Sequence, residues 1–274
     1  MFYFLELKKS SCSSTNKPKE TASMKIHAIS ISPRKGMRKT NVDSANLLAD
    51  FGLENDAHAG KWHRQVSLLA QESIDTMRAK GLEVVAGNFA ENITTTGIDL
   101  LSLPIGAHLE VGAGEIVISQ IGKVCHHKCA IFYQAGDCVM PREGIFGVVI
   151  RGGTIRIGDP IRITGGHSVS AGIIGTAAVE EESGERLKKK LQSLWAPAFI
   201  RFDRLNSEED NLQEILKDAV ELQRIDHLLI FDPSGRHLIA LLEKETRKIS
   251  TGCYQKQKTT IHYCKSLDEV WSLK

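Results

Sequence analysis

A short basic segment, residues 121–129, holds the side chains best suited to chemistry. It contains Cys125 and Cys129 together with two histidines and two lysines, directly after an apolar, strand-like run. Lysine and protonated histidine stabilise a nearby anion and so favour the thiolate form of cysteine. A thiolate attacks sulfur and is a good ligand for a soft metal. The segment predicts sulfur or metal chemistry at Cys125.

Other interpretations of these cysteines stay open. A cysteine that follows a strand is often a buried packing residue, but the charged neighbours of Cys125 argue against burial. Cys129 and Cys138 could act as resolving thiols, as a redox pair or as zinc ligands. Zinc would draw on Cys125, His126, Cys129 and Cys138. The two-residue ligand spacing that is usual in zinc sites is absent.

Composition narrows the class of protein. The 274 residues, 42% of them hydrophobic, suffice for two modest domains or one large one. A net charge of +2 gives no overall attraction to nucleic acid or to a membrane surface. Six cysteines in a chain of this length do not resemble a disulfide framework, which favours the reducing cytoplasm. The oligomeric state is left open.

The patterning divides the chain into three parts. Residues 1–23 are expected to be a disordered extension, with Met24 as a candidate natural start. Residues 24–164 are rich in strands and glycine turns, with a strand at 25–32 and a hairpin whose arms flank Gly158-Asp159-Pro160. One helix is predicted over residues 71–80, with Gly81 as its C-terminal cap. This part is predicted to be mainly β, as in a barrel or sandwich.

Residues 165–274 alternate strand-like and helix-like runs and are predicted to form a small α/β domain. Thr164 to Ser168 is expected to be the linker. Strands are expected at 171–177, 198–202, 226–232 and near 261, and helices at 183–194, 211–222, 238–248 and near 273. That order predicts a parallel sheet.

Residues 24–163 resemble the MOSC domain, the module named after the C-terminal part of molybdenum-cofactor sulfurases, in its stand-alone bacterial branch. The resemblance follows the order and spacing of several motifs over about half the chain. These motifs are Ser30–Gly36, Gly52–Leu68, Asn88–Thr94, the Cys125 segment, Tyr133–Phe146 and Ile157–Asp159.

The resemblance implies a β-barrel-like fold in which Cys125 carries sulfur as a persulfide or ligates molybdenum of the pterin cofactor. The sulfur would come from a pyridoxal-phosphate-dependent cysteine desulfurase, and a molybdoenzyme would be the acceptor. Lys61, Arg64, Lys123 and Arg142 could pair with the phosphate of the cofactor.

Four further residues of these motifs are expected near the site. His58 and Asn92 are predicted to line it, and the amide of Asn92 could bind the pterin edge. Glu91 is expected to line the site beside Asn92, and Asp56 accompanies His58 in the same loop. For all four, the alternative is ordinary turn or strand-end hydrogen bonding.

Residues 168–274 resemble, more faintly, the molybdopterin-adenylyltransferase fold. Ala171–Ile174 followed by Glu181-Glu182-Ser183-Gly184 is similar to its opening. Where that family has a threonine- and glycine-rich phosphate loop, this chain has Phe231–Arg236. We therefore expect a degenerate relative without adenylyl transfer that serves in docking or dimerisation.

Three functions remain at this point. The first, which the residues favour, is sulfur carriage or molybdenum-cofactor binding through Cys125. The second is a cofactor-dependent reductase of N-hydroxylated compounds, which would need a reductase partner because no flavin or nicotinamide motif is present. The third is a zinc-stabilised interaction module, which should unfold with a chelator.

Overall fold

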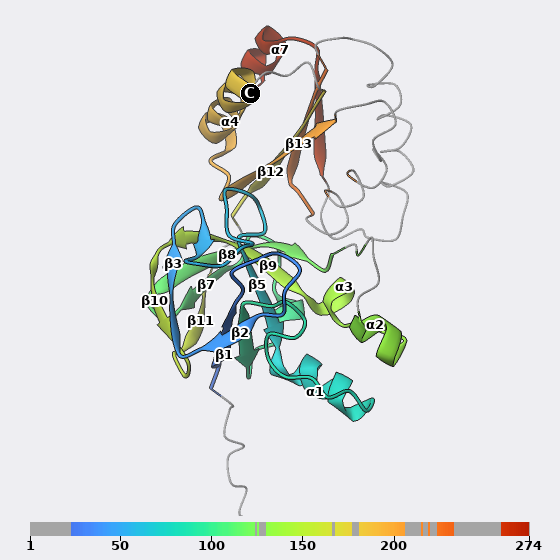
Figure 1. Cartoon of the computed structure of the whole chain (residues 1–274). Helices are drawn as coiled ribbons and strands as arrows, with labels where there is room; N and C mark the ends of the chain where they lie inside the picture. The colour runs from blue at the N-terminus through green and yellow to red at the C-terminus, as the bar shows by residue number, and fades with distance from the viewer. Residues whose placement is uncertain are drawn as a thin grey trace, which may run out of the picture.

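The computed structural model describes residues 23–123, 125, 130–165, 168–176, 181–205, 215, 219, 224–232 and 259–273. Within these residues the chain forms a strand-rich part below and a smaller α/β part above, as viewed in Figure 1. The mainly β fold followed by a small α/β domain is confirmed. The predicted extension at residues 1–23 lies, except for residue 23, outside the described residues.

Two sheets that do not close into a barrel make up the strand-rich part. The strands of the larger sheet, in spatial order, are β11 (Ile161–Gly165), β7 (His108–Val111), β8 (Gly114–Ile121), β9 (Ile145–Arg151), β5 (Val66–Ala70), β6 (Ile93–Thr96), β1 (Lys25–Ile31) and β2 (Thr40–Val42). The smaller sheet has the order β10 (Gly153–Arg156), β3 (Ser44–Leu48) and β4 (Gly52–Leu53). Because β11 extends to Gly165, the predicted linker residues Thr164 and Gly165 belong to a strand.

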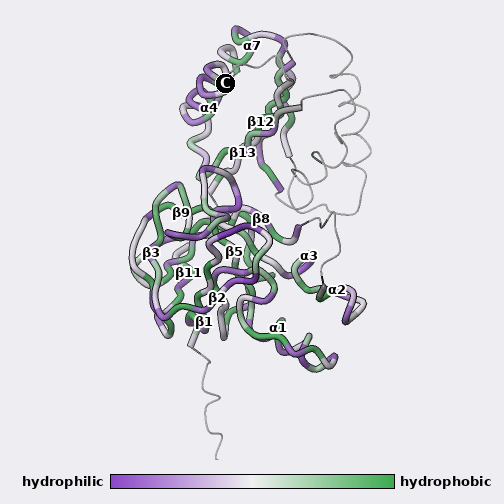
Figure 2. The backbone as a smooth tube through the Cα atoms, viewed as in Figure 1, coloured by the Kyte–Doolittle hydropathy of each residue, from purple (hydrophilic) through white to green (hydrophobic). Residues whose placement is uncertain are grey.

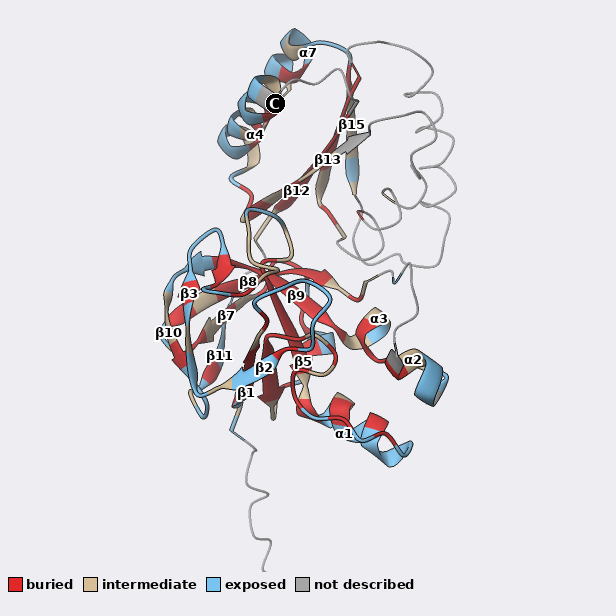
Figure 3. Cartoon of the chain, viewed as in Figure 1, coloured by how far each residue is buried: buried red, intermediate tan, exposed pale blue. Residues whose placement is uncertain are grey.

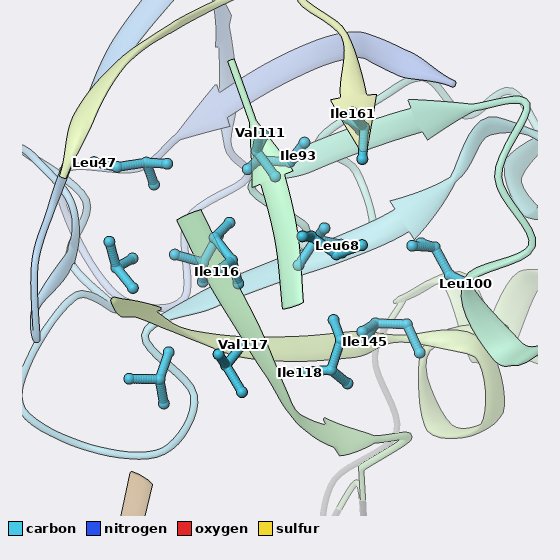
Figure 4. Packing of buried hydrophobic residues seen from close by; sticks show 14 of the residues in the cluster. Leu47, Leu68, Ile93, Leu100, Val111, Ile116, Val117, Ile118, Ile145 and Ile161 are labelled. Atoms are coloured by element: carbon cyan, nitrogen blue, oxygen red, sulfur yellow. The ribbon is translucent and has the colours of Figure 1, made fainter. Parts of the chain in front are cut away.

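The main core lies between these sheets and consists of aliphatic side chains from alternate strand positions. Leu68, Ile93, Ile116 and Ile145 are completely buried in it (Figure 4). Alternation places every second residue on the opposite face. There Leu69 and Phe146 pack in a second cluster with Ile74 and Met77.

Short helices accompany the larger sheet. They are α1 (Gln71–Ala79), α2 (Ala130–Ala135), α3 (Met140–Glu143) and the 3₁₀ helix η1 (Leu100–Ser102). The predicted helix is confirmed as α1, which buries Ile74 and Met77. Gly81 follows with a φ of 89°, the left-handed conformation expected of a glycine at a helix end.

The predicted hairpin around Gly158 is wrong, because its two arms pair with other strands. β10 pairs with β3 and β11 pairs with β7. The start of β1 lies between the arms: the Gly158 amide donates to the Ile26 carbonyl at 2.9 Å, and the Ile26 amide donates to the Asp159 carbonyl at 2.9 Å. The alternation of apolar and polar residues from Ile155 to Ile163 shows which side chains face the core, but it does not identify the partner strand.

The α/β part has one parallel sheet in the order β13 (Phe199–Leu205), β12 (Ser170–Thr176), β14 (His227–Phe231) and β15 (Thr260–Cys264). The helices α4 (Glu181–Trp195) and α7 (Leu267–Ser272) lie on one side of it (Figure 1). α4 is mostly hydrophilic (Figure 2) and consists largely of exposed and half-buried residues (Figure 3), but its Leu187 and Leu191 are buried. The predicted parallel layer is confirmed; the predicted helices 211–222 and 238–248 lie outside the described residues, except for positions 215 and 219.

Close packing of β9 against β8 leads to a testable expectation at Gly147. A Cβ atom there would lie 2.3 Å from Cγ2 of Ile116 and 3.0 Å from the Val117 carbonyl oxygen. We expect Gly147→Ala to lower the free energy of unfolding by about 1–3 kcal/mol, because the core has no room for the methyl group. Urea titration measures it, with Ile150→Ala, at an exposed position of the same strand, as the control. Equal losses in the two variants would contradict the packing argument.

Candidate functional site

One face of the larger sheet carries a row of polar and aromatic side chains across several strands. Gln120 of β8 is paired with Phe146 of β9, which is paired with Ser67 of β5. Asn92, just before β6, accepts hydrogen bonds from the Ser67 amide at 3.2 Å and the Ser67 hydroxyl at 3.0 Å. Its amide nitrogen donates to the Ser30 carbonyl of β1 at 3.1 Å. The row is therefore fixed by strand register and by the side chain of Asn92.

Asp56 holds the loop that precedes β5 against this row. Its carboxylate accepts hydrogen bonds from the Ser32 amide at 3.1 Å, the His58 amide at 2.9 Å and the Asn92 side chain at 3.1 Å, and from the buried ammonium of Lys39. Burial alone would raise the pKa of Asp56. Hydrogen bonds from His58 and Lys39 outweigh burial and hold the pKa well below its usual range. A buried carboxylate with this many donors is a structural anchor.

Glu91 anchors the neighbouring turn in the same way. Its completely buried carboxylate accepts from the backbone amides of Gly87 and Phe89 and from the Thr94 hydroxyl. Burial raises the pKa of Glu91 although these hydrogen bonds oppose the shift. Because its carboxylate is completely buried and bonded to this turn, Glu91 supports the loop that presents Asn92.

His63 and Arg64 lie next to the row, at the end of the Asp56 loop. The Arg64 guanidinium lies 4.8 Å from the centre of the Trp62 ring and 5.7 Å from that of Phe146. The Ser119 hydroxyl of β8 donates to the His63 carbonyl. Burial, followed by the charges of Arg201 and Arg64, lowers the pKa of His63 well below its ordinary value. His63 is therefore a neutral ring at neutral pH, in a positively charged setting.

Cys125 lies beyond the end of β8 and is exposed. The chain leading to it is fixed, because the Gly122 amide donates to the Gly144 carbonyl at 2.7 Å and the Lys123 amide donates to the Pro141 carbonyl at 3.2 Å. The structure thus holds residues 122 and 123 beside Pro141 and Gly144 and leaves the Cys125 thiol accessible. His126 and Cys129 lie outside the described residues.

The predicted phosphate-binding residues differ in their surroundings. Lys61 is exposed and its charge acts on Glu185 of α4, and Lys123 is half-buried. Arg142 is engaged elsewhere: its guanidinium makes two 3.0 Å hydrogen bonds to the Asp137 carboxylate, which also accepts from Lys80 at 2.8 Å. A ligand would have to displace Asp137 before it could bind Arg142 bidentately.

The predicted lining residues also make contacts within the protein. His58 is half-buried, with Nδ1 3.4 Å from Asp56. The side-chain amide of Asn92 makes the hydrogen bonds described above to Ser67, Ser30 and Asp56. These contacts favour a supporting role for Asn92 over contact with a pterin. Contact of either residue with a cofactor stays a prediction.

Sequence reasoning did not single out Lys39 or Arg201. Lys39 is one of several basic residues in a polar stretch, and nothing in the sequence marks it as the one that is buried. Arg201 lies in a strand of the α/β part, remote in sequence from the other site residues. Its position near His63 depends on how the two parts pack, which periodicity does not encode.

The suggested zinc site stays a prediction, because two of its four ligands, His126 and Cys129, lie outside the described residues. The described residues contain no group of three histidine, cysteine, aspartate or glutamate side chains that could hold a metal ion. Cys138, one of the four suggested ligands, is buried in the cluster with Ile131 and Met140, whereas Cys125 is exposed.

A cavity of about 340 Å³ lies elsewhere. Its lining includes Ala70, Ile98, Leu100 and Glu143 and contains none of the predicted site residues.

The contrast between exposed and buried thiols leads to a labelling prediction. Burial raises the pKa of Cys264 to about 11, so its thiol should be protonated and inaccessible at neutral pH. We expect iodoacetamide to alkylate Cys125 in the native protein well before Cys264 or Cys138. Peptide mass mapping over a time course measures the rates, and alkylation in denaturant gives the reference. Equal native rates at Cys125 and Cys264 would contradict the placement of Cys125.

Among solved structures, YiiM from Geobacillus stearothermophilus is similar with 19% sequence identity over 52% of this chain and 75% of its own, with a TM-score of 0.40. YiiM from Escherichia coli is similar with 14% identity over 87% of this chain and 98% of its own, with a TM-score of 0.42. No curated protein matches the chain.

No helix within the described part of the chain is long and apolar enough to cross a membrane.

The family model that matches is that of the MOSC domain, and it covers residues 55–162. This segment contains His58, Asn92 and Cys125. Residues 55–162 are therefore similar to the MOSC domain, a module associated in general with functions of the molybdenum cofactor.

Proposed function

We propose that this protein acts in molybdenum-cofactor metabolism through Cys125, either by binding the cofactor with its thiolate or by carrying sulfur on it. The observation that carries the proposal is the exposure of Cys125 within a MOSC domain, while the other described cysteines, Cys138 and Cys264, are buried. An accessible thiolate is required by both forms of the proposal.

The chemistry of the predicted site residues fits the molybdenum cofactor. A thiolate is a soft donor suited to molybdenum, and Arg64, Lys61 and Lys123 provide cations for a phosphate group. When bound, the cofactor would supply a redox-active metal. Asp56 acts indirectly because it fixes the loop that presents His58 and Arg64, and Glu91 acts indirectly because it fixes the turn that presents Asn92.

Sulfur carriage would need two partners. A pyridoxal-phosphate-dependent cysteine desulfurase would present a persulfide, and the Cys125 thiolate would attack its terminal sulfur. The new S–S bond forms on Cys125 while the old one breaks and leaves the desulfurase thiolate. A molybdoenzyme or its cofactor would then accept the sulfur.

The test is to purify the full chain from a host that makes molybdenum cofactor and from one that cannot. Cofactor binding would be supported if only the first preparation contained molybdenum and showed the fluorescence of oxidised pterin. A gain in mass of one sulfur atom at Cys125, removable by reductant, would support sulfur carriage. Zinc alone in both preparations, with no added sulfur after incubation with a desulfurase and cysteine, would overturn both forms.

A further inference from the structure

Arg201 connects the α/β part to the MOSC domain. Phe199 and Arg201 lie on one face of β13, and Ile200 and Phe202 lie on the other. Phe199 is buried in the main core of the strand-rich part, whereas Ile200 and Phe202 pack against the core of the α/β part. Because side chains alternate along a strand, Arg201 faces the MOSC domain together with Phe199. It belongs to the junction of the two parts, where β13 approaches the larger sheet (Figure 1).

The Arg201 guanidinium is buried and only partly paired. The residue is 6% exposed. Its Nε and Nη2 donate to the Asp203 carboxylate, with 3.0 Å between Nη2 and Oδ1. Nη1 is also buried and has no hydrogen-bond partner among the residues that the structure describes. A buried donor on a charged group is costly to leave unsatisfied, so this position favours an acceptor that arrives from outside the chain.

The charges around Arg201 indicate that this acceptor is an anion. Its positive charge acts on the ring of His63, as does that of Arg64. The charges of two arginines therefore act on one histidine, and Arg201 is paired with the Asp203 carboxylate. A guanidinium with a spare donor beside a second arginine matches the oxygens of a phosphate group.

We propose that Arg201, together with the His63-Arg64 segment, forms a phosphate-binding site at the junction between the MOSC domain and the α/β part. The ligand is either free inorganic phosphate or the phosphate of a larger monoester such as a cofactor. The site would give residues outside the matched MOSC segment a direct part in ligand binding. It does not depend on the role proposed for Cys125, because phosphate binding needs no thiolate.

The test is a calorimetric titration of the full chain with inorganic phosphate, at constant ionic strength set by chloride. We expect saturable binding that Arg201→Gln weakens by roughly tenfold or more, since it removes a charged donor. Arg162→Gln is the control, because Arg162 is exposed and its nearest partner, Glu110, is 3.7 Å away. Absence of saturable binding by the wild type, or equal affinity in Arg201→Gln, would overturn the proposal and leave a water molecule as the partner of Nη1.

A second variant keeps the test informative if Arg201→Gln does not fold. Asp203→Asn removes the competing carboxylate and should tighten phosphate binding, whereas a purely structural Arg201–Asp203 pair predicts no gain. Unchanged or weaker binding would count against the site.

The source of the phosphate is distinguished with protein loaded with molybdenum cofactor. If inorganic phosphate no longer binds to the cofactor-loaded protein, the phosphate of the cofactor is the ligand of the site. If inorganic phosphate binds as tightly as before, free phosphate is the ligand. The same titration on Cys125→Ser separates this site from the proposed function: phosphate binding should survive there even if no cofactor is bound.

Discussion

Replacing Cys125 with serine should remove molybdenum and pterin from protein purified from a host that makes the cofactor. Serine differs from cysteine by one atom, but its hydroxyl stays protonated at neutral pH and is a hard donor, so it cannot replace a thiolate as a soft ligand or persulfide carrier. Because Cys125 is exposed, the free energy of unfolding should change by less than about 0.5 kcal/mol. Elemental analysis, pterin fluorescence and urea unfolding of both proteins measure these effects.

Cys138→Ala is the matched control for this experiment. Cys138 is buried in the cluster that includes Met140 and Phe146, so its loss should reduce stability by about 1 kcal/mol and leave the cofactor content unchanged. Full retention of molybdenum and persulfide sulfur in Cys125→Ser would show that Cys125 is not the ligand or the carrier. Loss of cofactor in both variants would point to a folding effect and count against a specific role of Cys125.

Much of the fold could be predicted because it depends on local patterns. The helix α1 follows from its apolar spacing and Gly81, and the parallel sheet of the α/β part follows from alternating strand and helix signals. The hairpin around Gly158 could not be predicted correctly, because the choice between β1, β3 and β7 as partner is made by contacts distant in sequence.

The candidate site was predictable at the level of motifs but not of individual contacts. The exposed position of Cys125 follows from its charged neighbours. The pairing of Arg142 with Asp137, and of Lys39 with Asp56, depends on which of many charged groups the fold brings together. Residue type identified cations that could bind phosphate; only the structure shows that Arg142 is already engaged and that Arg201, from the α/β part, lies near His63.

Asp56 should prove the most sensitive residue of the site for stability. In Asp56→Asn the buried Lys39 ammonium would lose its carboxylate, and an amide NH₂ group would point at the donors of Ser32 or Asn92. Breaking one partner of a buried ion pair typically lowers the free energy of unfolding by about 3–5 kcal/mol. Urea unfolding measures the loss, and Asp75→Asn, in an exposed pair with Arg78, should lose less than about 1 kcal/mol.

The dependence of stability on pH gives an independent check on Asp56. The pKa of Asp56 is held below its usual value in the folded protein, so its contribution is present above the unfolded pKa of about 4 and is lost as the pH falls toward the folded pKa. Asp56→Asn should therefore flatten the acid side of the stability curve.

Lys39→Met added to Asp56→Asn tests the physical origin of the loss. The double variant should recover part of the stability, because it removes the buried charge that Asp56→Asn leaves unpaired. A single variant as stable as Asp75→Asn, or a double variant less stable than Asp56→Asn alone, would contradict the view that the loop bearing His58 and Arg64 is held in place by a buried ion pair.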